Sequence, residues 1–61
     1  MIRYVIIREL GSCQVFYNEM YDEWISDSPT LYLTYKYAEE MISLKNLQSS
    51  TTRIRQVKID L

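Results

Sequence analysis

Carboxylates and large aromatic rings are interleaved in one short segment, "FYNEMYDEWISD" (residues 16–27). The acids are Glu19, Asp22, Glu23 and Asp27, the rings are Phe16, Tyr17, Tyr21 and Trp24, and the segment has no basic residue. Trp and Tyr dominate the energetics of protein interfaces, and acidic side chains attract a basic surface. We therefore expect one continuous partner-binding patch, in which Tyr21 and Trp24 are anchors and Glu19, Asp22, Glu23 and Asp27 attract the partner.

A second candidate surface lies near the C-terminus, where three basic residues fall within a stretch that alternates like a strand. Arg53, Arg55 and Lys58, with Tyr4 on a neighbouring strand, would offer charge to phosphates and a ring to bases. The sequence pI of about 5.2 is low for a nucleic-acid-binding domain, which is usually basic. A nucleic-acid-binding module is accordingly the alternative to protein docking.

The residues needed for catalysis are scarce. The chain has no His, and Gly11 is its only glycine, so neither a His-based nucleophile pair nor a glycine-rich phosphate loop can be assembled. The neighbouring acids of Glu39-Glu40 would point apart on a helix, and we expect no pocket in so small a domain. Cys13, the only cysteine, is expected to be buried as a small apolar residue. We expect no enzyme, no cofactor and no metal.

Charge is unevenly distributed along the chain. Residues 19–40 hold six acidic residues and one basic residue, a net charge of −5, whereas the remainder holds six basic and two acidic residues, a net charge of +4. If the first and last strands are neighbours, the basic residues gather on one part of the sheet: Arg3, Arg8, Arg53, Arg55 and Lys58. The acidic end would suit a basic protein surface, such as a nucleic-acid-binding groove.

A chain of 61 residues forms one domain, residues 1–61, and buries too little surface to be more than marginally stable. With one cysteine and no His, neither a disulfide nor a cysteine-rich zinc site can support it, which leaves oligomerisation. A homodimer, or a purely structural homo-oligomer, is therefore a further alternative. No stretch reaches the roughly 20 apolar residues of a membrane span, and the lone thiol favours the cytoplasm.

The hydrophobic pattern predicts four strands and one helix. Strands are expected at residues 2–10 and 13–20 around a Gly11-Ser12 turn, at 22–26 as a short third strand, and at 53–61. Thr34 is the expected N-cap of a helix over residues 35–48, with an apolar face of Tyr37, Ala38, Met41, Ile42 and Leu44. The fold class is α+β: a two-layer domain in which one helix covers one face of a small antiparallel sheet, with the last strand beside the first and the other face bare.

The chain combines the opening "RYVIIRE", the early Gly11, "VFYN", Trp24, "YLTYKYAEEMISL" and the closing "IRQVKIDL". The order of these motifs resembles that of small uncharacterised proteins from bacteriophages and prophages of Gram-positive bacteria. The resemblance covers most of the chain and assigns no binding residue. It implies a host-directed or regulatory phage protein in the host-cell cytoplasm. Within that class, small acidic inhibitors, anti-CRISPR proteins included, occupy the nucleic-acid sites of host enzymes. The function we expect is thus a non-enzymatic inhibitor that docks on a host protein.

Overall fold

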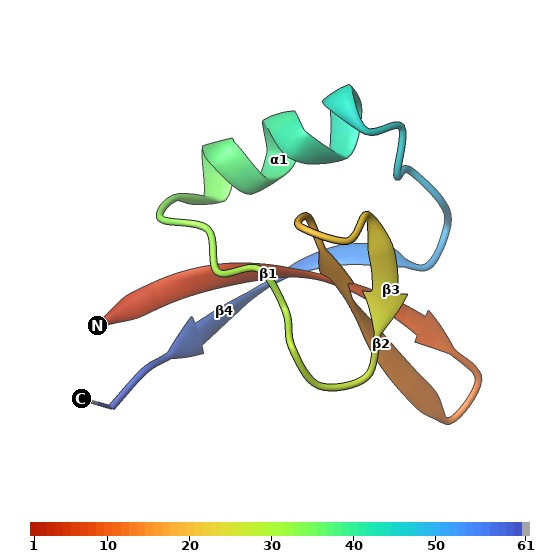
Figure 1. The fold of residues 1–61 in the computed structure, drawn as a ribbon, viewed down its shortest axis with the longest axis horizontal. Helices are drawn as coiled ribbons and strands as arrows, with labels where there is room; N and C mark the ends of the chain where they lie inside the picture. Colours follow the sequence, from red (N-terminus) through yellow and green to blue (C-terminus); the bar gives the residue numbers. More distant parts are fainter. Residues whose placement is uncertain (61) are drawn as a thin grey trace.

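A computed structural model describes residues 1–60 as a four-stranded antiparallel sheet with one helix packed on one face (Figure 1). The strands lie in the order β3-β2-β1-β4, so that β4 is beside β1 as the sequence predicts. The elements are β1 (Ile2–Leu10), β2 (Cys13–Asn18), β3 (Glu23–Ile25), α1 (Tyr35–Leu44) and β4 (Thr52–Lys58). The predicted α+β architecture is confirmed.

The β1–β2 hairpin turns through the two residues between Leu10 and Cys13, which pair with each other. Gly11 has a φ of 64°, in the left-handed region that glycine enters without steric cost. Two-residue loops of this kind match the right-handed twist of the strands that they join. The position of the only glycine therefore sets the register of the hairpin, and with it the face on which each β2 side chain lies.

The centre of β1 is buried on both faces of the sheet. Val5, Ile6 and Ile7 are each at most 1% exposed, although consecutive strand residues point to opposite sides. Ile6 faces α1, and Val5 and Ile7 face the opposite, outer side of the sheet, which no second layer covers. The sequence predicts this outer face to be bare, but Val5 and Ile7 are buried at its centre.

Two arginines of β4 cover the centre of this outer face. Arg55 Nη1 donates a hydrogen bond to Gln14 Oε1 at 3.1 Å, although β1 lies between the strands that carry them, so the Arg55 side chain crosses β1. Arg53 forms an ion pair with Glu9 on β1 at 3.2 Å. Arginine stems shield apolar surface while their charged ends remain in water. Ile7 lies between Arg53 on β4 and the half-buried Phe16 on β2, and it is buried without a second layer.

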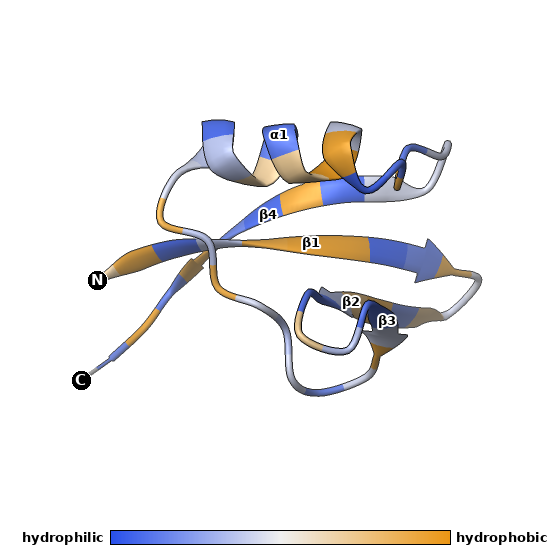
Figure 2. Cartoon of the chain, turned by 45° about the horizontal axis from the view of Figure 1, so that its top comes forward, coloured by the Kyte–Doolittle hydropathy of each residue, from blue (hydrophilic) through white to orange (hydrophobic). Residues whose placement is uncertain are grey.

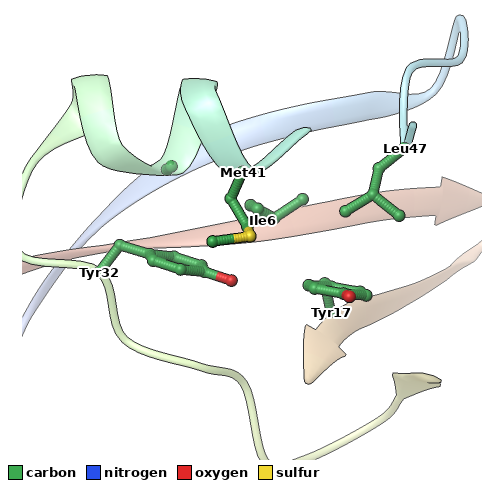
Figure 3. Packing of buried hydrophobic residues seen from close by; sticks show 6 residues of the cluster. Ile6, Tyr17, Tyr32, Met41 and Leu47 are labelled. Carbon is green, nitrogen blue, oxygen red and sulfur yellow. The ribbon is translucent and has the colours of Figure 1, made fainter. Parts of the chain in front are cut away.

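The core between sheet and helix is built around two tyrosines as well as aliphatic residues. Figure 3 shows Met41 of α1 above Ile6, with the Tyr32 ring reaching beneath Met41 and its hydroxyl end directed toward Tyr17. Ala38 and Leu47 complete this buried cluster. Hydrophilic residues line the outward side of α1 (Figure 2), and of the predicted apolar helix face Tyr37 and Leu44 are exposed.

Segment 30–32 fills the space where β2 diverges from β1. Tyr32 exchanges two backbone hydrogen bonds with Tyr4, both at 2.8 Å, and the Thr30 N–H donates to the Tyr17 carbonyl at 3.1 Å. The first half of β1 thus has β4 on one side and Tyr32 on the other. This connection carries the chain from the sheet edge back to the start of α1.

Both ends of α1 have well-formed caps. The Thr34 side chain accepts a hydrogen bond from the Tyr37 N–H at 3.0 Å, as the sequence predicts for an N-cap. The helix ends at Leu44, earlier than predicted, because Asn46 takes a φ of 57°. The Leu47 N–H then donates to Ile42 O at 2.8 Å and the Asn46 N–H to Ser43 O at 3.2 Å, the Schellman arrangement. This stop turns Leu47 into the core.

The last strand is shorter than predicted. β4 ends at Lys58, and the Ile59 N–H still donates to Met1 O at 2.8 Å. The alternation of Val57, Ile59 and Leu61 predicts that they share one face of the strand, and Val57 and Ile59 are half-buried. Leu61, the third residue of that predicted face, lies outside the described residues.

We predict that Asn46→Val lowers the free energy of unfolding by about 1–2 kcal/mol, because a β-branched residue fits the left-handed region poorly. Asn46→Gly should leave stability unchanged or raise it slightly. Urea denaturation measures both. Gln48→Val, at an exposed site outside the left-handed region, is the matched control and should change stability by less than about 0.5 kcal/mol. Equal losses for the two valine variants would contradict this account of the helix stop.

Candidate protein-docking surface

The acidic turn between β2 and β3 is folded back on its own strands. Asp22 adopts a φ of 53°, and its carboxylate accepts a hydrogen bond from the Tyr17 hydroxyl. The Tyr21 N–H donates to Asn18 Oδ1 at 3.1 Å. Short polar side chains stabilise such turns by bonding nearby groups. Asp22 therefore holds the turn and caps a buried tyrosine, which is a structural use of one of the predicted docking acids.

Trp24 also has a structural role. Its ring is half-buried, lies 5.5 Å from the Tyr17 ring between centroids, and packs against the core cluster. The Arg8 guanidinium carbon lies 4.1 Å from the centre of the indole ring, a cation–π contact. Arg8 in turn donates to the Leu47 carbonyl at 3.1 Å. Through Arg8, Trp24 thus connects the sheet to the segment after α1. It does not project into solvent as an interface anchor would.

The other predicted docking residues are spread over several surfaces. Tyr21 is 65% exposed at the tip of the β2–β3 turn. Glu23 pairs with Asn18 on the outer sheet face, opposite α1, and Asp27 lies in the following loop, where its carboxylate accepts from Ser28 Oγ at 3.4 Å. Glu19 is half-buried. The expectation of one continuous patch made by residues 16–27 is therefore wrong: the register of β3 sends Glu23 and Trp24 to opposite faces.

Glu19 instead belongs to a solvent-open recess that sequence reasoning missed. The recess has a volume of about 220 Å³ and is lined by Glu19, Thr30, Leu31, Tyr32, Leu33 and Tyr37. Three distant parts of the chain meet there: the end of β2, segment 30–33, and the first turn of α1. The Glu19 N–H donates to Thr30 Oγ1 at 2.8 Å, which fastens the first two together. We call this feature the Glu19 recess.

Tyr32 provides an apolar wall of the Glu19 recess and an unsatisfied polar atom. The residue is 4% exposed, its ring lies 5.6 Å from that of Tyr37, and its hydroxyl has no hydrogen-bond partner among residues 1–60. Burial raises the pKa of Tyr32, and the nearby negative charge of Glu19 raises it further. A buried hydroxyl without a partner costs about 1–3 kcal/mol. Most buried polar atoms in proteins have a partner, so this hydroxyl beside Glu19 and Thr30 is an exception that calls for an explanation.

Large exposed apolar side chains line the recess or lie within two residues of its lining in the sequence. Leu33 is 66% exposed and Tyr37 50% exposed, and Leu31 and Tyr35 are also exposed. On the β2–β3 turn, Met20 and Tyr21 are exposed as well. Groups of exposed apolar residues on a small protein commonly mark interaction sites. In the sequence, the alternation of "TLYLT" was the available signal, since it buries Tyr32 and leaves Leu31 and Leu33 in solvent.

The three basic residues of the nucleic-acid alternative do not share a face. Arg53 and Arg55 pair with Ile7 and Val5 on the outer face, whereas Lys58 pairs with Ile2 and points to the helix side, as Tyr4 does. Arg53 and Arg55 are also engaged with Glu9 and Gln14. The β1–β4 register thus places the basic residues on two opposite faces, whereas a nucleic-acid-binding surface would need them on one face.

Two further features bear on chemistry. Cys13 is exposed, so the expectation that it is buried is wrong; it lies at the hairpin turn, where the strand has no layer above it. Within residues 1–60 no group of three or more His, Cys, Asp or Glu residues is placed to hold a metal ion. The only helix among these residues is too short to cross a membrane.

The raised pKa of the buried Tyr17 predicts that the protein loses stability at alkaline pH. Burial, the hydrogen bond to Asp22 and the charges of Asp22 and Glu19 raise the pKa of Tyr17 from 10.0 to about 12. Below pH 10 the phenol is protonated in folded and unfolded chains, and its contribution is fully present. Between pH 10 and 12 the unfolded chain loses the proton first, so the free energy of unfolding should fall by up to about 1.4 kcal/mol per pH unit for each such tyrosine.

Urea denaturation between pH 8 and 12 tests this, with Tyr17→Phe expected to reduce the alkaline slope. The variant should cost about 1 kcal/mol at pH 7 through the lost hydrogen bond. Tyr21→Phe, at an exposed tyrosine, is the control and should keep the wild-type slope. A Tyr17→Phe slope equal to that of wild type would refute the assignment.

The site is thus a recess in which one carboxylate, two tyrosine rings and exposed leucines meet beside an unsatisfied hydroxyl. This arrangement offers binding through charge and apolar contact. Comparison with protein-family models, with curated proteins and with solved structures finds no match to the chain.

Proposed function

We propose that this protein is a non-enzymatic binding protein that docks on a basic protein surface through the Glu19 recess and the exposed residues around it. The observation that carries the proposal is the recess itself, because it combines a half-buried carboxylate with aromatic walls. The docking residues are then Glu19 and Tyr21 from the predicted set, with Leu31, Leu33 and Tyr37 in place of Trp24.

The recess suits the side chain of a partner's lysine or arginine. Such a side chain has an apolar stem, which would lie against Tyr37 and Leu33, and a cationic end, which would meet Glu19. An ion pair in a partly buried site is screened less by salt than one on an open surface. The volume of about 220 Å³ accommodates one long side chain rather than a folded element.

The exposed apolar residues would supply the remaining contact area. Trp, Tyr and Met are enriched at protein interfaces, and Met20, Tyr21, Tyr35 and Tyr37 are all exposed. Exposed acids of α1, Glu39 and Glu40, would add long-range attraction to a basic partner and increase the association rate.

The finer part of the proposal concerns the partner. The resemblance to phage and prophage proteins and the net charge of −5 over residues 19–40 support a host nucleic-acid-binding protein, whose phosphate-binding groove is basic. Occupying that groove would make the protein an inhibitor. Affinity capture from a host lysate, followed by competition with DNA or RNA, tests this part separately from the recess.

We predict that Glu19→Gln weakens binding of a synthetic peptide of alternating Arg and Leu about three- to tenfold at low salt, since loss of a charge-assisted contact costs roughly 1 kcal/mol. Titration followed by two-dimensional NMR should place the largest amide shifts at Glu19, Thr30, Leu33 and Tyr37. Asp27→Asn removes an equal charge outside the recess and is the matched control.

The proposed recess is rejected if Glu19→Gln and Asp27→Asn weaken binding equally, because the peptide would then respond only to net charge. Tyr37→Ala is a second test of the recess, since this substitution removes an apolar wall without changing the charge. It should weaken binding at high salt as well as at low salt.

A further inference from the structure

The hydrogen-bond pattern between β1 and β4 can be read from its two ends. At one end the Ile59 N–H donates to Met1 O at 2.8 Å, and at the other the Glu9 N–H donates to Thr51 O at 3.2 Å. In an antiparallel pair, opposite residues alternate between bonded and non-bonded. The bonded pairs of the ladder are therefore Arg3–Val57, Val5–Arg55 and Ile7–Arg53.

The alternate residues of β4 consequently direct their backbone groups away from the sheet. Ile54, Gln56 and Lys58 each present an N–H and a carbonyl on the outer edge, because β4 is an end strand. No backbone or side-chain hydrogen bond to these groups from elsewhere in residues 1–60 is present. The result is an open row of donors and acceptors of the kind that a further strand can join.

The opposite sheet edge is a much poorer template. β3 has only three residues, and its pairs with β2 are Phe16–Ile25, Tyr17–Trp24 and Asn18–Glu23. By the same alternation, only the backbone of Trp24 points outward there. Short edge strands are a common protection against unwanted pairing. Only the β4 edge offers a run of groups long enough to bind an extended segment.

The charge of β4 indicates what kind of strand would join it. Residues 52–58 contain Arg53, Arg55 and Lys58 and no acid. Arg53 and Arg55 lie two residues apart on the outer sheet face, the spacing at which side chains of an extended strand share a face. Opposite charges on neighbouring strands stabilise pairing, and like charges weaken it. A strand carrying acids at alternate positions is complementary to this edge.

We propose that the β4 edge is a second binding site, at which an acidic extended segment of another protein adds as a fifth strand beside Ile54–Lys58. Backbone groups of Ile54, Gln56 and Lys58 would bind the main chain. Arg53 and Arg55 would select the acids by exchanging Glu9 and Gln14 for carboxylates of the added strand. A second copy of this chain is disfavoured at the edge, because two β4 strands would bring six basic residues together without an acid. The site is independent of the Glu19 recess.

The register provides a sharp test with two proline variants. Gln56→Pro removes an outward N–H and leaves the ladder to β1 intact, so the fold should persist, since proline is accepted on edge strands. The probe is a blocked synthetic peptide of alternating Val and Glu, titrated into the labelled full chain by NMR. Wild type should show its largest amide shifts at Ile54, Gln56 and Lys58, and Gln56→Pro should bind at least about tenfold more weakly.

Two further variants separate backbone pairing from charge selection. Arg55→Pro should unfold the chain or displace β4, because it removes an N–H that bonds to Val5. Arg53→Gln with Arg55→Gln keeps a polar side chain over Ile7 and Val5 but removes both charges, so it should abolish the preference for the Val-Glu peptide over the corresponding Val-Lys peptide, while circular dichroism shows that the fold is retained.

Several results would overturn the proposal. Equal binding of the Val-Glu peptide to wild type and to folded Gln56→Pro would show that the edge is not used. Equal binding of the Val-Glu and Val-Lys peptides would remove charge selection. A homodimer that Gln56→Pro abolishes would make a second copy the occupant, and amide shifts at β4 caused by a short oligonucleotide but not by the peptide would assign the face to nucleic acid.

Discussion

The fold depends on burying β1 from both sides. Val5, Ile6 and Ile7 form a continuous apolar stretch, and a strand residue cannot be buried on both faces unless each face is covered. The helix side uses Met41, Ala38, Leu47 and two tyrosines, whereas the outer side uses side chains from the neighbouring strands, held across it by Arg53–Glu9 and Arg55–Gln14. One helix is therefore enough for a chain of this size.

The aromatic and acidic segment that dominates the sequence is largely used to build the fold. Tyr17 and Trp24 pack on each other, Arg8 covers Trp24, and Asp22 binds the Tyr17 hydroxyl. Rings of this size supply much of the buried area that a short chain lacks. Asp22 supplies the partner that the buried Tyr17 hydroxyl needs, and Arg8 lies over the face of the Trp24 ring. Much of the crowding of rings and carboxylates in residues 16–27 is thus explained by their role in the core and in the β2–β3 turn.

What remains at the surface is divided by charge. The Glu19 recess lies where the end of β2, segment 30–33 and the start of α1 meet, and the β4 edge lies at the far end of the sheet. The first has a carboxylate and exposed rings, and the second has arginines and an open backbone edge. The two sites are separated by β1, because segment 30–32 lies beside β1 on the side opposite β4. The two proposed sites are therefore of opposite charge.

The sequence alone determined the elements and their order, because hydrophobic period, one glycine and one threonine cap act locally. It predicted four strands, the helix start at Thr34 and the α+β architecture. It did not predict the early helix stop at Asn46, the exposed Cys13, or the recess. Those depend on which distant residues meet: Glu19 joins Tyr32 only because segment 30–32 fills the gap between β1 and β2. Tertiary structure alone decided that Trp24 faces inward, since a strand's register, not its composition, assigns each side chain to a face.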